Sequence, residues 1–131
     1  MLAKITVSDY MAKHLLTVKE DTDVIEAISK LLDHKITCAP VLNDQGKLVG
    51  MFSEKDCMKV VLETAYNQGQ SGRVGEFMTR DLITVDADSS ILDLAQKFRE
   101  TPLRSFPVYK QGELVGVVSR TDVLKALISI K

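Results

Sequence analysis

The chain has 131 residues, of which 45% are hydrophobic and 27% charged, and its formal net charge is −1. This composition is typical of globular proteins and excludes a disordered or fibrous chain. A net charge so close to zero gives no electrostatic basis for binding nucleic acid or an anionic membrane surface. No signal peptide is recognisable, and no apolar run approaches the roughly 18 residues that cross a bilayer. We therefore expect a cytoplasmic protein.

The sequence contains an internal repeat whose elements follow the same order twice. Residues 7–41 match residues 74–108 at an offset of 67, which becomes 66 after a turn that is one residue longer in the first copy. Each copy opens with a short turn or helix (7–11, 74–78) and a short extended segment (15–18, 82–85). We predict one repeat over 1–63 and another over 74–131, joined by a polar, Gly-rich linker at 64–73.

The next predicted element in each copy is an amphipathic helix. Asp21–Thr22 and Asp88–Ser89 are placed to cap its N-terminus. The apolar residues that fall on one helical face are Val24, Ile28, Leu31 and Leu32 in the first copy, and Ile91, Leu94, Ala95 and Phe98 in the second.

A hairpin follows each of these helices. The predicted strands are 38–42 with 47–52, and 105–109 with 113–118, each pair joined by a turn that contains glycine. Pro40 and Pro107 cannot donate to a ladder, so we expect them at the first residues of a strand or at an edge.

Each hairpin runs into a heptapeptide, GMFSEKD at 50–56 and GVVSRTD at 116–122, and then into a closing helix. Ser53 and Ser119 stand where a helix N-cap belongs, and Asp56 and Asp122 complete a Ser-x-x-Asp capping box. The N-terminus of a helix favours an anion such as phosphate. A carboxylate in the first turn can also accept hydrogen bonds from the two vicinal hydroxyls of a ribose. The alternative is that both motifs only cap helices.

The order, spacing and repetition of these elements resemble a tandem pair of CBS domains, also called a Bateman module, over almost the whole chain. The resemblance implies a stand-alone CBS-domain protein with an α+β (α/β-like) fold. Two βαββα repeats would be related by a pseudo-two-fold axis, with small sheets packed face to face and helices outside. In the family, two equivalent clefts between the repeats often bind adenosine nucleotides or related adenosyl ligands.

The resemblance also implies the residues of each cleft. Ser and Asp would come from one repeat, and the rest of the lining from the first strand and hairpin start of the other. One cleft would combine Ser53 and Asp56 with Leu82, Ile83, Leu103, Arg104 and Ser105. The other would combine Ser119, Arg120 and Asp122 with Leu15, Leu16, Ile36, Thr37, Cys38 and Ala39. The carboxylate would hold the ribose hydroxyls, and the serine would face the ribose-phosphate.

The two clefts are not expected to be equal. Arg120 follows Ser119 at the helix start, where a guanidinium can pair with phosphate in a forked geometry. Its counterpart Glu54 is a second carboxylate close to Asp56 and repels an anion unless Lys55 or Arg104 compensates for its charge. We therefore expect tighter binding of an anionic nucleotide at Ser119 and Asp122.

From this resemblance we expect a regulatory binding module that forms a homodimer and signals occupancy to an effector protein. Possible ligands are AMP, ADP, ATP and S-adenosylmethionine, and no cofactor is obligatory. The alternative is a dimerisation or protein-interaction module with unoccupied clefts. Cys38 and Cys57 fit no metal or disulfide pattern, and neither His14 nor His34 has a partner at metal-ligand spacing. With no catalytic dyad or triad in sight, neither an enzyme nor a metal site is expected.

Overall fold

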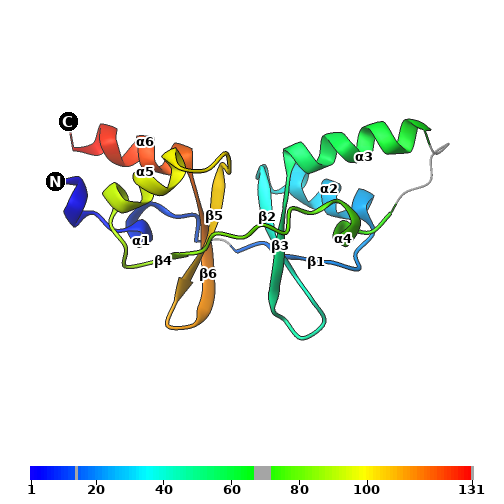
Figure 1. Cartoon of the computed structure of the whole chain (residues 1–131), viewed down its shortest axis with the longest axis horizontal. Coiled ribbons are helices and arrows are strands. Elements are labelled where there is room, and N and C mark those ends of the chain that lie inside the picture. Colours follow the sequence, from blue (N-terminus) through cyan, green and yellow to red (C-terminus); the bar gives the residue numbers. More distant parts are fainter. Residues whose placement is uncertain (14, 67–71, 131) are drawn as a thin grey trace. The chain divides into compact units, whose positions relative to one another are not determined.

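The computed structural model describes residues 1–13, 15–66 and 72–130, which form two compact units (Figure 1). The first unit comprises Met1–Leu15 and Ile83–Lys131, and the second comprises Leu16–Leu82. Each unit contains one three-stranded sheet with both parallel and antiparallel pairs, flanked by helices. The α+β class predicted from the sequence is confirmed.

The second unit is built on the sheet β1-β2-β3. Strand β1 (Val18–Lys19) runs parallel to β2 (Cys38–Leu42), which forms an antiparallel hairpin with β3 (Leu48–Ser53). The helices are α2 (Val24–Asp33), α3 (Glu54–Tyr66) and α4 (Val74–Phe77). Helices α2 and α3 lie to one side of the hairpin in Figure 1, and they bury Val24, Leu31 and Val60 against its apolar residues.

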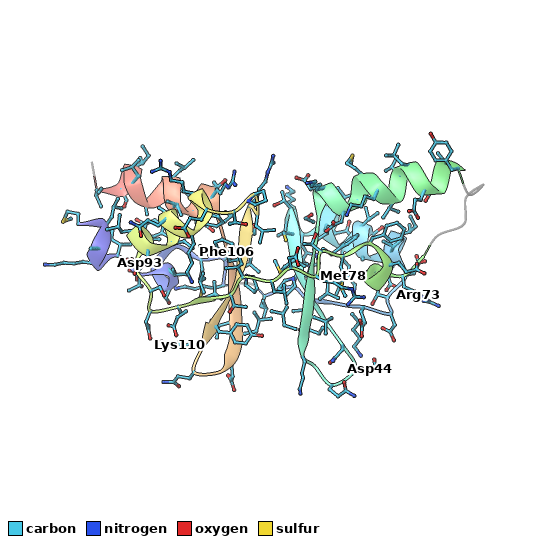
Figure 2. The ribbon with its side chains drawn as sticks, in the orientation of Figure 1. Asp44, Arg73, Met78, Asp93, Phe106 and Lys110 are labelled. Atoms are coloured by element: carbon cyan, nitrogen blue, oxygen red, sulfur yellow. The ribbon has the colours of Figure 1, made fainter. Side chains whose placement is uncertain are left out.

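The first unit repeats this plan with the sheet β4-β5-β6. Its strands are β4 (Val85–Asp86), β5 (Ser105–Lys110) and β6 (Glu113–Ser119). Its helices are η1 (Leu2–Lys4), α1 (Val7–Tyr10), α5 (Ile91–Arg99) and α6 (Arg120–Ser129). Phe98 of α5 stacks on Phe106 of β5, labelled in Figure 2, with 4.2 Å between ring centroids. Both hairpins were predicted to within one residue at each strand end.

Two details of the helix prediction were wrong. Leu32 is 73% exposed, and Ala27 is buried in its place, because the buried face of α2 runs through Val24, Ala27 and Leu31. The N-caps lie later than predicted, at Asp23 and Ser90, whose side chains accept the backbone N–H groups three residues on. The residues predicted as caps belong instead to turns that follow β1 and β4.

The opening segment of each sequence repeat packs in the same unit as the sheet of the other repeat. Ala12 pairs with Val117 of β6, and Thr79 pairs with Met51 of β3. In Figure 1 the blue N-terminal segment accordingly lies with the yellow-to-red elements, and α4 lies with the cyan and green ones. The chain passes between the units at Leu15–Leu16 and again at Leu82–Ile83. The compact units therefore have different boundaries from the sequence repeats.

The predicted linker 64–73 also differs in part from the structure. Helix α3 continues to Tyr66, so the first three linker residues are helical. The carbonyl of Gly72 accepts the backbone N–H of Val24, and Arg73 forms a bridge with Asp23. The segment 67–71 lies outside the described residues.

Gly50 and Gly116 permit the close approach of these opening segments. A Cβ atom on Gly50 would lie 2.7 Å from Sδ of Met78, labelled in Figure 2, and 2.8 Å from the carbonyl oxygen of Thr79. A Cβ on Gly116 would lie 2.5 Å from the carbonyl oxygen of Ala12. The glycine that opens each heptapeptide is therefore required by a backbone crossing.

Candidate functional site

Ser53 and Asp56 form a closed hydrogen-bonded pair where β3 passes into α3. The backbone N–H of Ser53 donates to Oδ2 of Asp56 at 2.9 Å, and the serine hydroxyl donates to the same oxygen at 3.0 Å. The backbone N–H of Asp56 lies 3.4 Å from Oγ of Ser53. These contacts are the capping box predicted from the sequence, so the motif does cap the helix.

The Asp56 carboxylate has further partners and is almost completely buried, with 1% exposure. The hydroxyl of Thr79 donates to Oδ1 of Asp56 at 3.1 Å and lies 3.4 Å from Oδ2. The ammonium of Lys59 lies 3.5 Å from Oδ1. Both carboxylate oxygens are thus occupied by donors from the same unit.

Ser119 and Asp122 form the corresponding pair where β6 passes into α6. The backbone N–H of Ser119 donates to Oδ2 of Asp122 at 2.8 Å, and the hydroxyl donates to Oδ2 at 3.1 Å. Asp122 is half-buried, and Ser119 supplies its only side-chain hydrogen bonds among the described residues. Oδ1 of Asp122 accepts no hydrogen bond from the described residues.

The start of each hairpin lies beside the Ser–Asp pair of its own unit. Ser53 is paired with Cys38 across β2 and β3, and the N–H of Glu54 donates to the carbonyl of Thr37 at 2.9 Å. In the other unit Ser119 is paired with Ser105, and the N–H of Arg120 donates to the carbonyl of Arg104 at 3.1 Å. The resemblance implies clefts in which the Ser–Asp pair of one repeat is combined with lining residues that come mostly from the other repeat. This combination stays a prediction.

The remaining predicted lining residues differ in exposure. Leu15 is 38% exposed and Ile83 is 37% exposed, and both lie where the chain passes between units, beside Leu16 and Leu82. Ala39 is fully buried in the core, so only its backbone could contact a ligand. Ile36 and Leu103 are partly buried and pack against the cores of their units.

Arg120 is exposed at the start of α6. Its Nη2 donates to the carbonyl of Thr101 at 3.2 Å, a contact that the sequence did not predict. A guanidinium carries five N–H donors, so this contact leaves several of them for an anion near the helix N-terminus.

A family model for the CBS domain matches the chain twice, over residues 7–63 and 74–129. The chain belongs to the CBS-domain family. A curated relative, the uncharacterized protein MJ1426 of Methanocaldococcus jannaschii, is 31% identical over 93% of this chain and 90% of its own length. Two longer relatives from the same organism are 29% and 31% identical, and the CBS chain spans only 42% and 32% of their lengths.

Solved structures of CBS pairs have the same fold. Arabidopsis thaliana CBSX2 in complex with AMP is 31% identical to this chain, with a TM-score of 0.80 over 96% of this chain and 98% of CBSX2. The CBS pair of protein MJ0100, in complex with 5′-methylthioadenosine and S-adenosyl-L-methionine, is 25% identical. Its TM-score is 0.81, and the match covers 96% of this chain and 98% of that one.

Thr79 is the residue at this site that sequence reasoning missed. The equivalent residue of the first CBS repeat is Ala12, so the two repeats differ in whether a hydroxyl stands at this position. That difference is visible in the aligned repeats. The structural consequence of the difference cannot be read from the sequence, because the contact of Thr79 with Asp56 depends on the opening segment of the second repeat lying on β3.

Both cysteines of this CBS pair are held as neutral thiols. Burial, with a smaller contribution from the Asp56 charge, raises the pKa of Cys38 from 9.0 to about 12. Burial, followed by the charges of Asp56 and Glu54, raises the pKa of Cys57. A thiol that stays protonated near neutral pH is a poor nucleophile. The described residues also contain no group of three His, Cys, Asp or Glu side chains placed to hold a metal.

Two further observations concern the histidines and the helices. Nδ1 of His34 lies 2.9 Å from the carbonyl oxygen of Lys30, within the end of its own helix, and His14 lies outside the described residues. No helix in the described part of the chain is both long and apolar enough to cross a bilayer.

Proposed function

We propose that this CBS pair is a regulatory module that binds an adenosine nucleotide or a related adenosyl ligand and signals its occupancy to an effector protein. AMP, ADP, ATP and S-adenosylmethionine are the candidate ligands. The relatives that are solved with AMP, or with 5′-methylthioadenosine and S-adenosyl-L-methionine, support this proposal. The raised pKa values of Cys38 and Cys57 give no support to catalysis by a cysteine nucleophile.

The observation that carries the proposal is the half-buried Asp122 carboxylate at the start of α6. Oδ2 is held by Ser119, and Oδ1 is left for the vicinal hydroxyls of a ribose. The phosphate of a nucleotide would lie near Arg120 and the positive end of the α6 dipole. Residues of the other repeat, namely Leu15, Leu16 and 36–39, would complete the lining as the resemblance implies.

We propose that the Asp56 site is the weaker of the two. Its carboxylate is 1% exposed and is already bonded to Ser53, Thr79 and Lys59. The neighbouring Glu54 adds a second negative charge near any phosphate. These contacts support the ranking that the sequence suggested from Arg120 and Glu54.

Calorimetry with AMP and with S-adenosylmethionine tests the proposal. Ligand bound only by the folded protein must also raise the melting temperature. Asp122→Ala should weaken the tighter binding event, and Asp56→Ala should leave it nearly unchanged, with melting curves run beside each titration to exclude unfolding. A larger affinity loss from Asp56→Ala would refute the ranking. Nucleotide turnover by the purified protein, abolished in Asp122→Asn, would instead favour an enzyme.

One observation favours a second role, in protein association. Helix α3 buries Cys57 and Val60 on one face but exposes apolar side chains on another, and α6 exposes apolar side chains at the equivalent positions. These side chains are Met58, Val61, Leu62 and Tyr66 on α3, and Leu124, Leu127 and Ile128 on α6. A helix that is apolar on two faces is normally buried on both. We propose that a second copy of the chain covers them in a homodimer.

Sedimentation equilibrium tests the homodimer. Leu62→Glu places a charge in the exposed face of α3 and should produce monomers, whereas Glu63→Gln, an exposed change beside it, should leave the dimer intact. A wild-type protein that is monomeric at micromolar concentration would contradict the proposal. A dimer that takes up neither AMP nor S-adenosylmethionine would instead point to an interaction module with unoccupied clefts.

A further inference from the structure

We propose that Thr79 is an affinity-determining residue that contributes to the inequality of the two Ser–Asp sites, because its hydroxyl occupies the carboxylate of Asp56. This inference rests on the proposed ligand-binding function. It goes further by assigning a measurable part of the inequality to one side chain, in a segment that carries neither Ser–Asp motif.

The contacts of Asp56 leave little capacity for a ligand. An ionised carboxylate has two oxygens and about four acceptor directions. Ser53 supplies two donors to Oδ2, at 2.9 and 3.0 Å. Thr79 donates to Oδ1 at 3.1 Å, and the Lys59 ammonium lies 3.5 Å from the same oxygen. A ribose that used Asp56 would have to displace the threonine hydroxyl.

Thr79 is held in place by its backbone as well. Its N–H donates to the carbonyl of Met51 at 2.8 Å, and the N–H of Met51 donates to the carbonyl of Thr79 at 2.9 Å. Met51 lies in β3, two residues before Ser53. The backbone pairing thus holds the hydroxyl of Thr79 next to the Asp56 carboxylate. The hydroxyl can compete with a ligand for this carboxylate without a further loss of conformational entropy.

The other unit provides a natural comparison. Ala12 pairs with Val117 of β6 as Thr79 pairs with Met51 of β3, so it stands at the same place relative to Asp122. An alanine methyl cannot donate a hydrogen bond, and Oδ1 of Asp122 accordingly accepts none from the described side chains. The two repeats therefore differ by a natural substitution, threonine at 79 and alanine at 12. With threonine, Oδ1 of the motif aspartate accepts a side-chain hydrogen bond, and with alanine it accepts none from the described side chains.

Reciprocal exchange of these residues tests the inference. Thr79→Val removes the hydroxyl and keeps the side-chain volume, and Thr79→Ser keeps the hydroxyl as the matched control. Measured in an Asp122→Ala background, so that only the Asp56 site reports, Thr79→Val should tighten AMP binding about fivefold, the equivalent of one hydrogen bond. Thr79→Ser should leave the dissociation constant unchanged. Ala12→Thr in the otherwise native chain should weaken the Asp122 site by a similar factor.

The outcomes separate this inference from the proposed function. If the native chain binds neither AMP nor S-adenosylmethionine, the proposed function fails, and this inference fails with it. If the native chain binds one of them but Thr79→Val, folded by its melting curve, leaves the Asp56 site unchanged, Thr79 has only a structural role and the inference alone is overturned. If Thr79→Val does not fold, Ala12→Thr decides, because an unchanged Asp122 site in that variant also overturns the inference.

Discussion

Thr79 and Met51 exchange two backbone hydrogen bonds, although they belong to different CBS repeats. Ala12 and Val117 form the same relationship in the other unit, at 2.9 and 3.4 Å. Each sheet therefore gains an additional pairing from the segment that opens the other repeat. The Ser–Asp pairs lie at the ends of the strands that receive these segments, so the segments determine what surrounds each carboxylate.

Alanine at Gly50 or Gly116 should destabilise the unit that contains it. The new methyl group would lie 2.8 Å from the carbonyl oxygen of Thr79, or 2.5 Å from that of Ala12, and backbone atoms cannot move aside cheaply. We expect a loss of about 1–3 kcal/mol in the free energy of unfolding, measured with urea. Gly46→Asn is the control, since nothing lies within 4 Å and asparagine tolerates its positive φ. If Gly46→Asn lowered the free energy of unfolding as much as alanine at Gly50 or Gly116, the close backbone approach at these two glycines would not be the cause.

Hydrogen exchange should group the opening segments with the sheets that they pair with. Val118→Ala loosens the core of the first unit and should accelerate exchange of the Val7 and Ala12 amides, which donate to Ser89 and Val117. Val60→Ala, in the core of the second unit, should instead accelerate exchange of the Thr79 amide. Local opening limits exchange in both cases. The reverse assignment would show that each segment stays with its own repeat.

Removal of the two motif carboxylates should cost unequal amounts of stability. Asp56→Ala removes a buried carboxylate and leaves the half-buried Ser53 and Thr79 donors without an acceptor, and we expect a loss of about 3 kcal/mol. Asp122→Ala removes a half-buried cap and should cost about 1 kcal/mol. Urea unfolding without ligand measures both. A cost for Asp122→Ala equal to that for Asp56→Ala would mean that the additional partners of Asp56 contribute nothing.

The raised pKa of Cys38 should make the fold sensitive to alkali. The folded state keeps the thiol neutral up to a pKa of about 12, whereas the unfolded chain ionises near 9.0. Stability from this group is complete below pH 9 and is lost as the pH rises from 9 towards 12, by up to about 1.4 kcal/mol per pH unit. The free energy of unfolding should therefore fall more steeply in the native protein than in Cys38→Val, measured under reducing conditions. Parallel slopes would contradict the shift.

Much of the fold was predictable because its signals are local. The Ser-x-x-Asp motif behind an apolar strand predicts a cap wherever it occurs, and both capping boxes are formed. The turn glycines, Gly46 and Gly112, have the positive φ that fixes each hairpin. Leu32 was misplaced because periodicity says that a helix has an apolar face but not how wide the buried part is.

The difference between the two carboxylates was less accessible to sequence reasoning. It depends on a pairing between Met51 and Thr79 that no local pattern encodes, since the two residues belong to different repeats. Arg120 and Glu54 led to the same ranking of the sites from their charges alone. The contact between Thr79 and Asp56 adds a cause that only the tertiary structure supplies.

The two units also differ in when they can be completed during synthesis. Leu16–Leu82 is one continuous stretch, so all its strands and helices are available once the ribosome has released that stretch. Residues 1–15 precede that stretch, yet Val117 of β6, the strand partner of Ala12, is synthesised only after it. Ala12, although translated before the second unit, consequently reaches its strand partner only after that unit has been made, and a nascent chain stalled before β6 would leave Ala12 without its strand.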